Sequence, residues 1–75
     1  MEPLDNDILA QIERDFTYHK PTGDQGERYE SLRFTGKGFA LAIARLCPDS
    51  KERAQALMLL NLACMSANAA IARNE

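Results

Sequence analysis

The feature that most constrains this chain is a helical apolar pattern that is interrupted once, at Cys47-Pro48. Before the interruption, apolar or small residues recur at steps of three and four, at Tyr29, Leu32, Gly36, Phe39, Ile43 and Leu46. After it, the same steps recur at Leu57, Leu60, Cys64, Ala67 and Ile71. Residues three and four apart share one face of an α-helix, so each series predicts a helix with one apolar seam. Because a proline breaks a helix, the two seams predict an antiparallel helical hairpin.

A second apolar stripe runs beside the seam of the later helix, at Met58, Leu62, Met65, Ala69 and Ala72. One partner helix can cover one stripe but not two, so an isolated hairpin would leave an apolar face in water. Either the short N-terminal segment folds back over this face, or further copies of the chain cover it. A chain of 75 residues buries only about 60% of its unfolded surface, which favours association. We therefore expect an all-α fold assembled as a homo-oligomeric helical bundle.

The chain is expected to form a single domain, residues 1–75, with a short N-terminal helix ahead of the hairpin. Asp5 or Asn6 can cap this first helix, and the residue before Pro21 is biased away from helix, which marks a connector. The expected segments are a helix at 1–15, a connector at 16–23 and helices at 24–47 and 49–73.

Two further capping patterns support these boundaries. Thr22 and Gln25 have the spacing of a capping box, which would start the second helix. Asp49 or Ser50 can cap the third helix, and Glu52 is placed to complete a box from Asp49.

The charge balance and the N-terminus argue against several classes of protein. Nine Lys and Arg against eleven Asp and Glu give a formal net charge of −2, whereas a general DNA or RNA binder presents a basic face. The N-terminal stretch MEPLDNDILA lacks the basic and apolar regions of a signal peptide. No uninterrupted apolar run approaches the ~20 residues that span a bilayer. We expect no DNA or RNA polymer and no membrane as partners, and a cytoplasmic location.

Enzymatic chemistry finds little support in the sequence. His19 is the only histidine, neither Cys47 nor Cys64 lies near it in the chain, and no Cys-x-x-Cys pair is present. The acids occupy capping or solvated positions, without the apolar-flanked pair that suits acid–base catalysis. We expect no catalytic residue, no metal site and no cofactor, and two free thiols in a reducing compartment.

One segment nevertheless concentrates groups that suit a planar, anionic ligand. The run FTYHKPTGDQGERYESLRFTGKG, residues 16–38, holds four of the five aromatic residues and the histidine. Tyr18, ahead of a proline-fixed turn, can present its ring to a base, and such a stack is worth about 1–3 kcal/mol. Arg33 and Lys37, one helical turn apart, share a face, and an arginine there can grip a phosphate. The plainer interpretation places Phe16 against the following helix and Tyr29 in the core.

Three stretches of the sequence resemble a known family: YHKP-TGDQGERYESLR, LCPDS-KERAQAL and MSANAAIARNE. The resemblance is to small phage anti-defence proteins, the anti-CBASS cyclic-nucleotide sponges and the related anti-Thoeris sponges. It implies a homo-oligomeric helical protein, hexameric in family members, acting in the host cytoplasm. It also implies sequestration of cyclic nucleotide immune signals without cleavage. In the family, cyclic dinucleotides such as cyclic GMP–AMP lie between two protomers, and cyclic trinucleotides lie where three meet.

Carried over by residue, the resemblance implies two sets of ligand contacts. The cyclic dinucleotide set is Tyr18 and Arg33, with Lys37 as the alternative cation one turn on. The cyclic trinucleotide set is His19, Thr35 and Arg73. His19, Gly36 and Gly38 depart from the common pattern of the family. Cyclic ADP-ribose derivatives are a further ligand class, as for the anti-Thoeris relatives. The residues leave two other functions open: a helical protein–protein interaction module, and a cyclic-nucleotide hydrolase, for which no base or metal set is recognisable.

Overall fold

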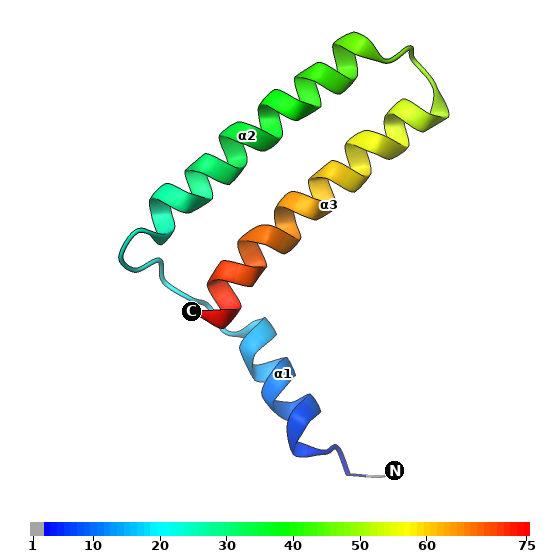
Figure 1. The fold of residues 1–75 in the computed structure, drawn as a ribbon. Helices are drawn as coiled ribbons and strands as arrows, with labels where there is room; N and C mark the ends of the chain where they lie inside the picture. The colour runs from blue at the N-terminus through cyan, green and yellow to red at the C-terminus, as the bar shows by residue number, and fades with distance from the viewer. Residues whose placement is uncertain (1–2) are drawn as a thin grey trace.

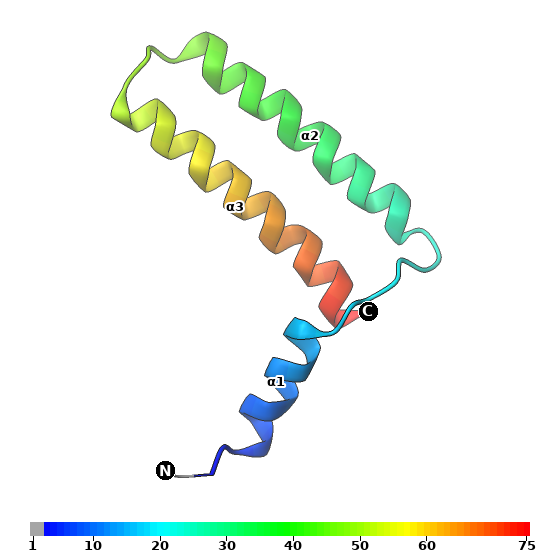
Figure 2. The same ribbon diagram turned by 180° about the vertical axis from the view of Figure 1, so that it is seen from behind.

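The computed structural model describes residues 3–75, and within that span the chain forms three α-helices and no strand. They are α1 (Asn6–Phe16), α2 (Gln25–Leu46) and α3 (Lys51–Asn74). Helices α2 and α3 lie side by side and antiparallel, joined by a short loop (Figure 1). Helix α1 points away from the hairpin and reaches it through a connector, residues 17–24, as the reverse view also shows (Figure 2). The predicted all-α hairpin with a short N-terminal helix is confirmed.

The first and third helices begin at capping side chains. The Asp5 carboxylate accepts a hydrogen bond from the backbone N–H of Ile8 at 2.8 Å. The Ser50 hydroxyl accepts one from the N–H of Arg53 at 3.1 Å. The predicted box from Asp49 to Glu52 does not form, because Ser50 takes the capping position and shifts the box register by one residue. Asp49 instead pairs with Arg53 at 3.1 Å.

The start of α2 uses the predicted Thr22–Gln25 pair in an altered form. The side-chain oxygen of Gln25 accepts from the backbone N–H of Thr22 at 2.9 Å, as in a capping box. The Gln25 N–H, however, donates to the Thr22 carbonyl at 3.0 Å, and the helix begins at Gln25 itself. Gly23, with a φ of 56°, makes the left-handed turn between them.

The α2–α3 seam allows close approach at one point. A Cβ atom added to Gly36 would meet the Sγ atom of Cys64 at 2.6 Å, so the glycine leaves room for the thiol. Both cysteines are free, as expected. Three assignments from the sequence are wrong. Leu46, at 83% exposed, and Phe39, at 60% exposed, are not covered by the seam. Phe16, at 86% exposed, does not pack as a staple.

The hairpin is too thin to enclose a core. Its smallest principal dimension is 13 Å, and no apolar side chain within residues 3–75 is fully buried. A compact monomer of 8.4 kDa would expose about 4,600 Å², so the 6,393 Å² observed is roughly 1,800 Å² in excess. Its radius of gyration is 16.7 Å, whereas a compact chain of this length has about 11 Å.

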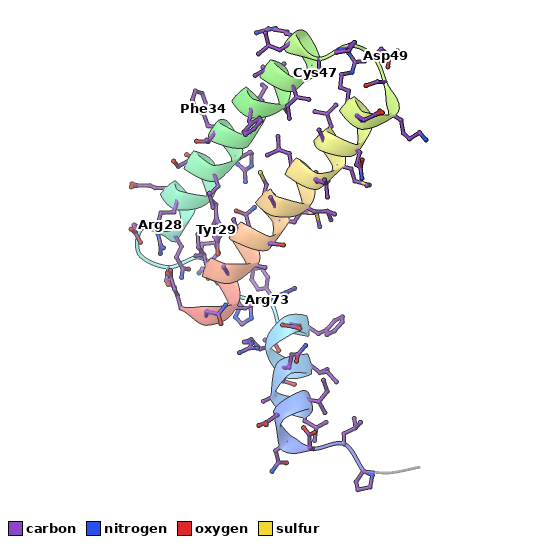
Figure 3. All side chains as sticks on the ribbon, turned by 45° about the vertical axis from the view of Figure 1, so that its right-hand side comes forward. Arg28, Tyr29, Phe34, Cys47, Asp49 and Arg73 are labelled. Carbon is purple, nitrogen blue, oxygen red and sulfur yellow. The ribbon has the colours of Figure 1, made fainter. Side chains whose placement is uncertain are left out.

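Helix α1 does not cover the second stripe of α3. In both ribbon views α1 lies beyond the end of the hairpin, so the fold-back arrangement is wrong for the single chain (Figures 1 and 2). Met58, Leu62 and Met65 of the stripe are about half exposed. On α2, Phe34 points away from α3 (Figure 3). Apolar surface therefore lies open on both outer sides of the hairpin.

Helix α3 is long enough and apolar enough, by length and composition alone, to cross a membrane. The sequence prediction considered only uninterrupted apolar runs. The mean hydropathy along α3, however, is high enough for a membrane-spanning helix. One such helix is weak evidence, because core helices of water-soluble proteins meet the same criterion.

Replacing Gly36 by alanine tests the seam. We expect Gly36→Ala to lower the free energy of unfolding by about 1–3 kcal/mol, because the added methyl group displaces Cys64. Gly38→Ala is the matched control: its Cβ meets nothing within 4 Å, and helix propensity should stabilise it by up to about 1 kcal/mol. Urea unfolding followed by circular dichroism, at one protein concentration, measures both. Equal stability of the two variants would contradict the close seam.

Candidate ligand-binding site

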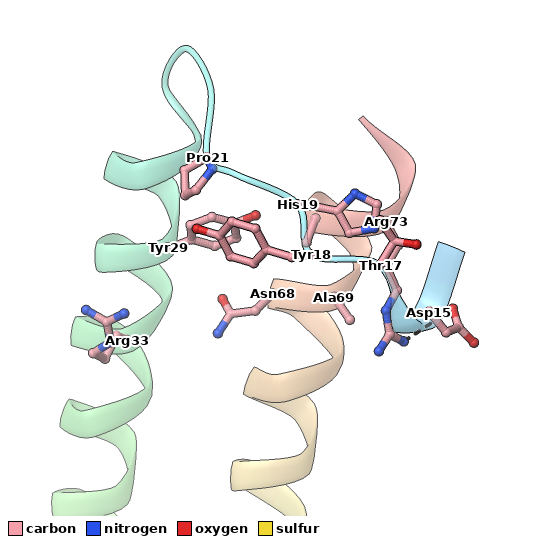
Figure 4. A pocket seen from close by; sticks show the side chains of 11 residues that line it. Asp15, Thr17, Tyr18, His19, Pro21, Tyr29, Arg33, Asn68, Ala69 and Arg73 are labelled. Atoms are coloured by element: carbon pink, nitrogen blue, oxygen red, sulfur yellow. Dashed lines mark ion pairs between the residues drawn. The ribbon is translucent and has the colours of Figure 1, made fainter. Parts of the chain in front are cut away.

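A hollow of about 450 Å³ opens where the connector passes across one end of the hairpin. Figure 4 shows it bounded by the connector and by both long helices, with the end of α1 at one side. Its lining residues are Asp15, Thr17, Tyr18, His19, Pro21, Tyr29, Arg33, Asn68, Ala69, Ala72 and Arg73. Segments distant in sequence thus supply rings, cations and an amide to one small volume.

The connector holds Tyr18 between two anchored neighbours. Thr17 donates its hydroxyl hydrogen to the Glu13 carbonyl at 2.5 Å, which satisfies a carbonyl near the end of α1. The Nε2 atom of His19 lies 2.8 Å from the Arg14 carbonyl. A carbonyl can only accept, so Nε2 carries the proton, and Nδ1 of the neutral ring remains an acceptor. The Tyr18 side chain itself is 82% exposed, so its ring is held out and open to a ligand.

Helix α2 adds a second ring and a cation to the same hollow. Tyr29 and Arg33 stand four residues apart, so their side chains emerge on one face, one turn apart. Tyr29 is half-buried, and it serves as a wall of the hollow as well as a packing residue. None of the ion pairs within residues 3–75 involves Arg33. Its guanidinium is therefore available to an anionic group.

Arg73 on α3 also lines the hollow, and its guanidinium faces the carboxylate of Asp15. Its Nη1 atom lies 3.7 Å from Oδ1 of Asp15, the α1 residue that also lines the hollow. Both side chains are partly exposed, so the pair is weak and solvent-screened. An anion that bound Arg73 would have to compete with Asp15 for the guanidinium.

The structure brings four of the six sequence-derived site residues together and leaves two outside. Tyr18, His19, Arg33 and Arg73 line one hollow. Thr35 lies on an apolar hollow between α2 and α3, and Lys37 lies on a neighbouring hollow of about 350 Å³. That neighbouring hollow shares Arg33 and Asn68 with the first, so the two adjoin at these residues.

Asn68, like Asp15 and Thr17, is a polar lining residue that sequence reasoning missed. Its Oδ1 atom is buried and has no hydrogen-bond partner in the described part of the chain. Figure 4 shows the amide reaching from α3 towards α2, on the same side as Arg33. A buried acceptor without a partner costs free energy, and native structures rarely leave one without a reason. A single asparagine in an alanine-rich helix gives no such signal in sequence.

A cluster of polar side chains closes the end of the hairpin beside this hollow. Arg28 binds the Glu75 carboxylate with both terminal nitrogens, one contact being Nη1 to Oε2 at 2.7 Å. Gln25, which is 8% exposed, donates from Nε2 to Oε1 of Glu75 at 3.2 Å. These hydrogen bonds, that from Arg28 above all, lower the pKa of the Glu75 carboxyl to about 2. The same contact raises the pKa of Arg28 further above its ordinary range.

The described residues include no evident metal site. Across residues 3–75, no three His, Cys, Asp or Glu side chains gather where they could hold a metal ion. The hollow offers rings, guanidinium groups and one amide, which suit stacking and anion binding.

Comparison with known proteins gave one match. A family model described as the Acb2/Tad1 hairpin domain matches residues 9–72. Searches of curated proteins and of solved structures found no match. The matched span contains the connector and nearly all of the hairpin, and Arg73 lies just beyond it.

The Glu75 contacts predict a pH-dependent effect on stability. A carboxyl whose pKa falls from 4.5 to about 2 on folding stabilises the protein above its unfolded pKa, and loses that effect as pH falls. We therefore expect Glu75→Gln to melt at a lower temperature than the wild type at pH 7. The gap should close between about pH 4.5 and pH 2. Scanning calorimetry across this pH range measures the difference in melting temperature between the two proteins. A difference that did not change with pH would show that Glu75 does not take part in the cluster.

Proposed function

Because the chain belongs to the Acb2/Tad1 hairpin family, the anti-CBASS and anti-Thoeris sponges, we propose that it sequesters cyclic dinucleotides without cleaving them. Members of this family bind cyclic nucleotide signals of bacterial defence rather than catalyse a reaction. Cyclic GMP–AMP is the ligand we would test first. As a phage anti-defence protein, it would act in the cytoplasm of the bacterial host.

The observation that carries this proposal is the meeting of Tyr18 and Arg33 in one hollow. The exposed ring can stack on a base, and the unpaired guanidinium, one turn beyond Tyr29, can bind a phosphate. Asn68 supplies an amide whose acceptor lacks a partner within residues 3–75. Because the Asn68 oxygen accepts no hydrogen bond from the described residues, the amide can rotate without loss of one. The oxygen can then accept a hydrogen bond from a ligand.

A single hollow is too open for tight binding, and this supports a site shared between copies. A sponge must bind its signal at about nanomolar concentration, near −12 kcal/mol. Two copies related by a two-fold axis would supply two Tyr18 rings and two Arg33 cations to a ligand with two bases and two phosphates. Apolar anchors and charged contacts preassembled in this way avoid much of the ordering cost of binding.

The excess surface of the chain supports the same assembly. The roughly 1,800 Å² beyond that of a compact monomer is comparable to a standard protein interface. The second stripe of α3 supplies apolar area for it. We propose a homo-oligomer, a hexamer as the family resemblance implies.

Cyclic trinucleotides and cyclic ADP-ribose derivatives are further candidate ligands. His19 and Arg73 lie in the described hollow, but Thr35 faces a different one. A trinucleotide site would therefore need Thr35 from another protomer, and release of Arg73 from Asp15.

The competing proposal is a protein–protein interaction module that uses the exposed α3 stripe. Its supporting observation is the half-exposed Met58, Leu62 and Met65. It requires a monomer or dimer with the stripe open, whereas a sponge requires a stable higher oligomer. Light scattering separates the two by mass.

Titration calorimetry with recovery of the ligand tests the sponge proposal. We expect cyclic GMP–AMP to bind at a fraction of one molecule per chain and to be released chemically unchanged on denaturation. Other cyclic dinucleotides, cyclic trinucleotides and cyclic ADP-ribose isomers complete the panel. A hydrolysed product would exclude sequestration, and no binding by any member would exclude the function while leaving the fold.

Removing the Tyr18 ring should weaken dinucleotide binding at least about tenfold, because a base stack is lost in each half of the site. Tyr18→Phe is the matched control: it keeps the ring and should bind nearly as the wild type does. The Tyr18 side chain is exposed, so light scattering should give the same mass for all three proteins. An unchanged affinity of Tyr18→Ala would place the stack elsewhere.

A further inference from the structure

Gln25 is the one buried residue of the described chain, and its amide links two separate segments. Its oxygen accepts from the N–H of Thr22 at 2.9 Å, and its nitrogen donates to Glu75 at 3.2 Å. A carboxylate can only accept, so Glu75 determines which end of the amide faces it. With the nitrogen turned to Glu75, the oxygen is left facing Thr22. Glu75, at the C-terminal end of α3, therefore fixes the orientation of the Gln25 amide in which its oxygen accepts the hydrogen bond from Thr22 of the connector.

Arg28 strengthens this arrangement from the next turn of α2. Its two terminal nitrogens engage both oxygens of Glu75, and Nη2 also lies 3.2 Å from Asp24, the residue that precedes the helix. Such a forked contact fixes the plane of the carboxylate as well as its position. The Glu75 side chain thus receives three donors from two residues of α2.

Because the hydrogen bond to Gln25 fixes the backbone of Thr22, it also restricts the position of Tyr18, four residues earlier. Pro21 has a fixed φ, and the residue before a proline has few allowed conformations, so the intervening chain is stiff. At its other end the connector is bonded to α1 through His19 and Arg14. Glu75 also lies two residues after Arg73, so the same cluster fixes the last turn of α3, on the opposite wall of the hollow.

We infer that Glu75 is a positioning residue of the ligand site, which acts through Gln25 and Arg28 to hold Tyr18 ready for stacking. The inference rests on the proposed function for its ligand, although the ordering of Tyr18 can be measured without one. Holding a side chain and its loop in the bound conformation raises affinity because that ordering cost is not incurred on binding.

Glu75→Gln is the direct test, since it keeps the shape and removes the charge and one strong acceptor. We expect cyclic GMP–AMP to bind about tenfold more weakly, the effect of releasing one ring and its loop. Glu52→Gln is the matched control: it removes the same charge from the far end of α3 and should bind as the wild type does.

Ligand-free tyrosine fluorescence gives an independent reading. The chain has two tyrosines and no tryptophan, so in a Tyr29→Phe background all emission comes from Tyr18. We expect the anisotropy of Tyr18 to fall when Glu75→Gln is added and to stay unchanged with Glu52→Gln. If the anisotropy falls but the wild type binds no cyclic nucleotide, the positioning stands and the proposed function fails. Unchanged anisotropy would overturn the positioning role whatever the ligand.

A charge reversal separates positioning from simple stabilisation. The double variant Arg28→Glu with Glu75→Arg restores an ion pair between the helices, but the guanidinium introduced at the end of α3 would offer Gln25 only donors. The amide then turns its oxygen to that guanidinium and loses Thr22. We expect thermal stability to recover in part, because the carboxylate introduced at position 28 also faces Asp24, while the Tyr18 anisotropy and the dinucleotide affinity stay low. Recovery of all three together would show that Glu75 acts only through stability.

Discussion

Two helices in contact along one seam form a layer that cannot surround a side chain, and the rest of this structure follows from that constraint. The seam residues of α3 are half-buried, since each is covered by α2 on one side and open on the other. The hydrophobic effect scales with the area removed from water, so a layer 13 Å thick gains only part of what a packed domain gains. Polar contacts at the ends of the hairpin contribute part of the difference, and in the proposed oligomer contacts between copies of the chain contribute the rest.

The same thinness explains where a ligand can bind. The hollow that combines aromatic rings with cations lies where the connector crosses the end of the hairpin. The connector sets Tyr18 and His19 against the faces of α2 and α3 that carry Arg33 and Arg73. The resulting hollow is open, because only one chain forms it. An open hollow with exposed rings and partly free cations has the form expected of half a site, which a second copy completes in the proposed oligomer.

The order of the site depends on contacts that are remote in sequence. Capping at Asp5 and Ser50 spans three residues and satisfies helix ends locally. The cluster of Gln25, Arg28 and Glu75 instead joins residues about fifty apart, and it fixes the connector from outside. Asp15 and Arg73 make a weaker contact of the same kind across the hollow. Electrostatic contacts therefore set the geometry of a site for which the apolar seam supplies only the frame.

Local chemistry in the sequence determined the helices, their approximate ends and the aromatic, cationic character of the connector. Periodicity, proline and capping side chains act over three to seven residues, so they can be read directly, and the resemblance to the sponge family added the candidate contacts. Only the tertiary structure decided that Thr35 and Lys37 lie outside the main hollow, that Asn68 lies within it, and that Glu75 contacts Gln25 at the start of α2. It also decided that α1 leaves the apolar stripe open. These outcomes depend on the rotation of one helix against another and on the path of the connector. Both follow from packing between residues distant in sequence, which produces no periodic pattern in the sequence.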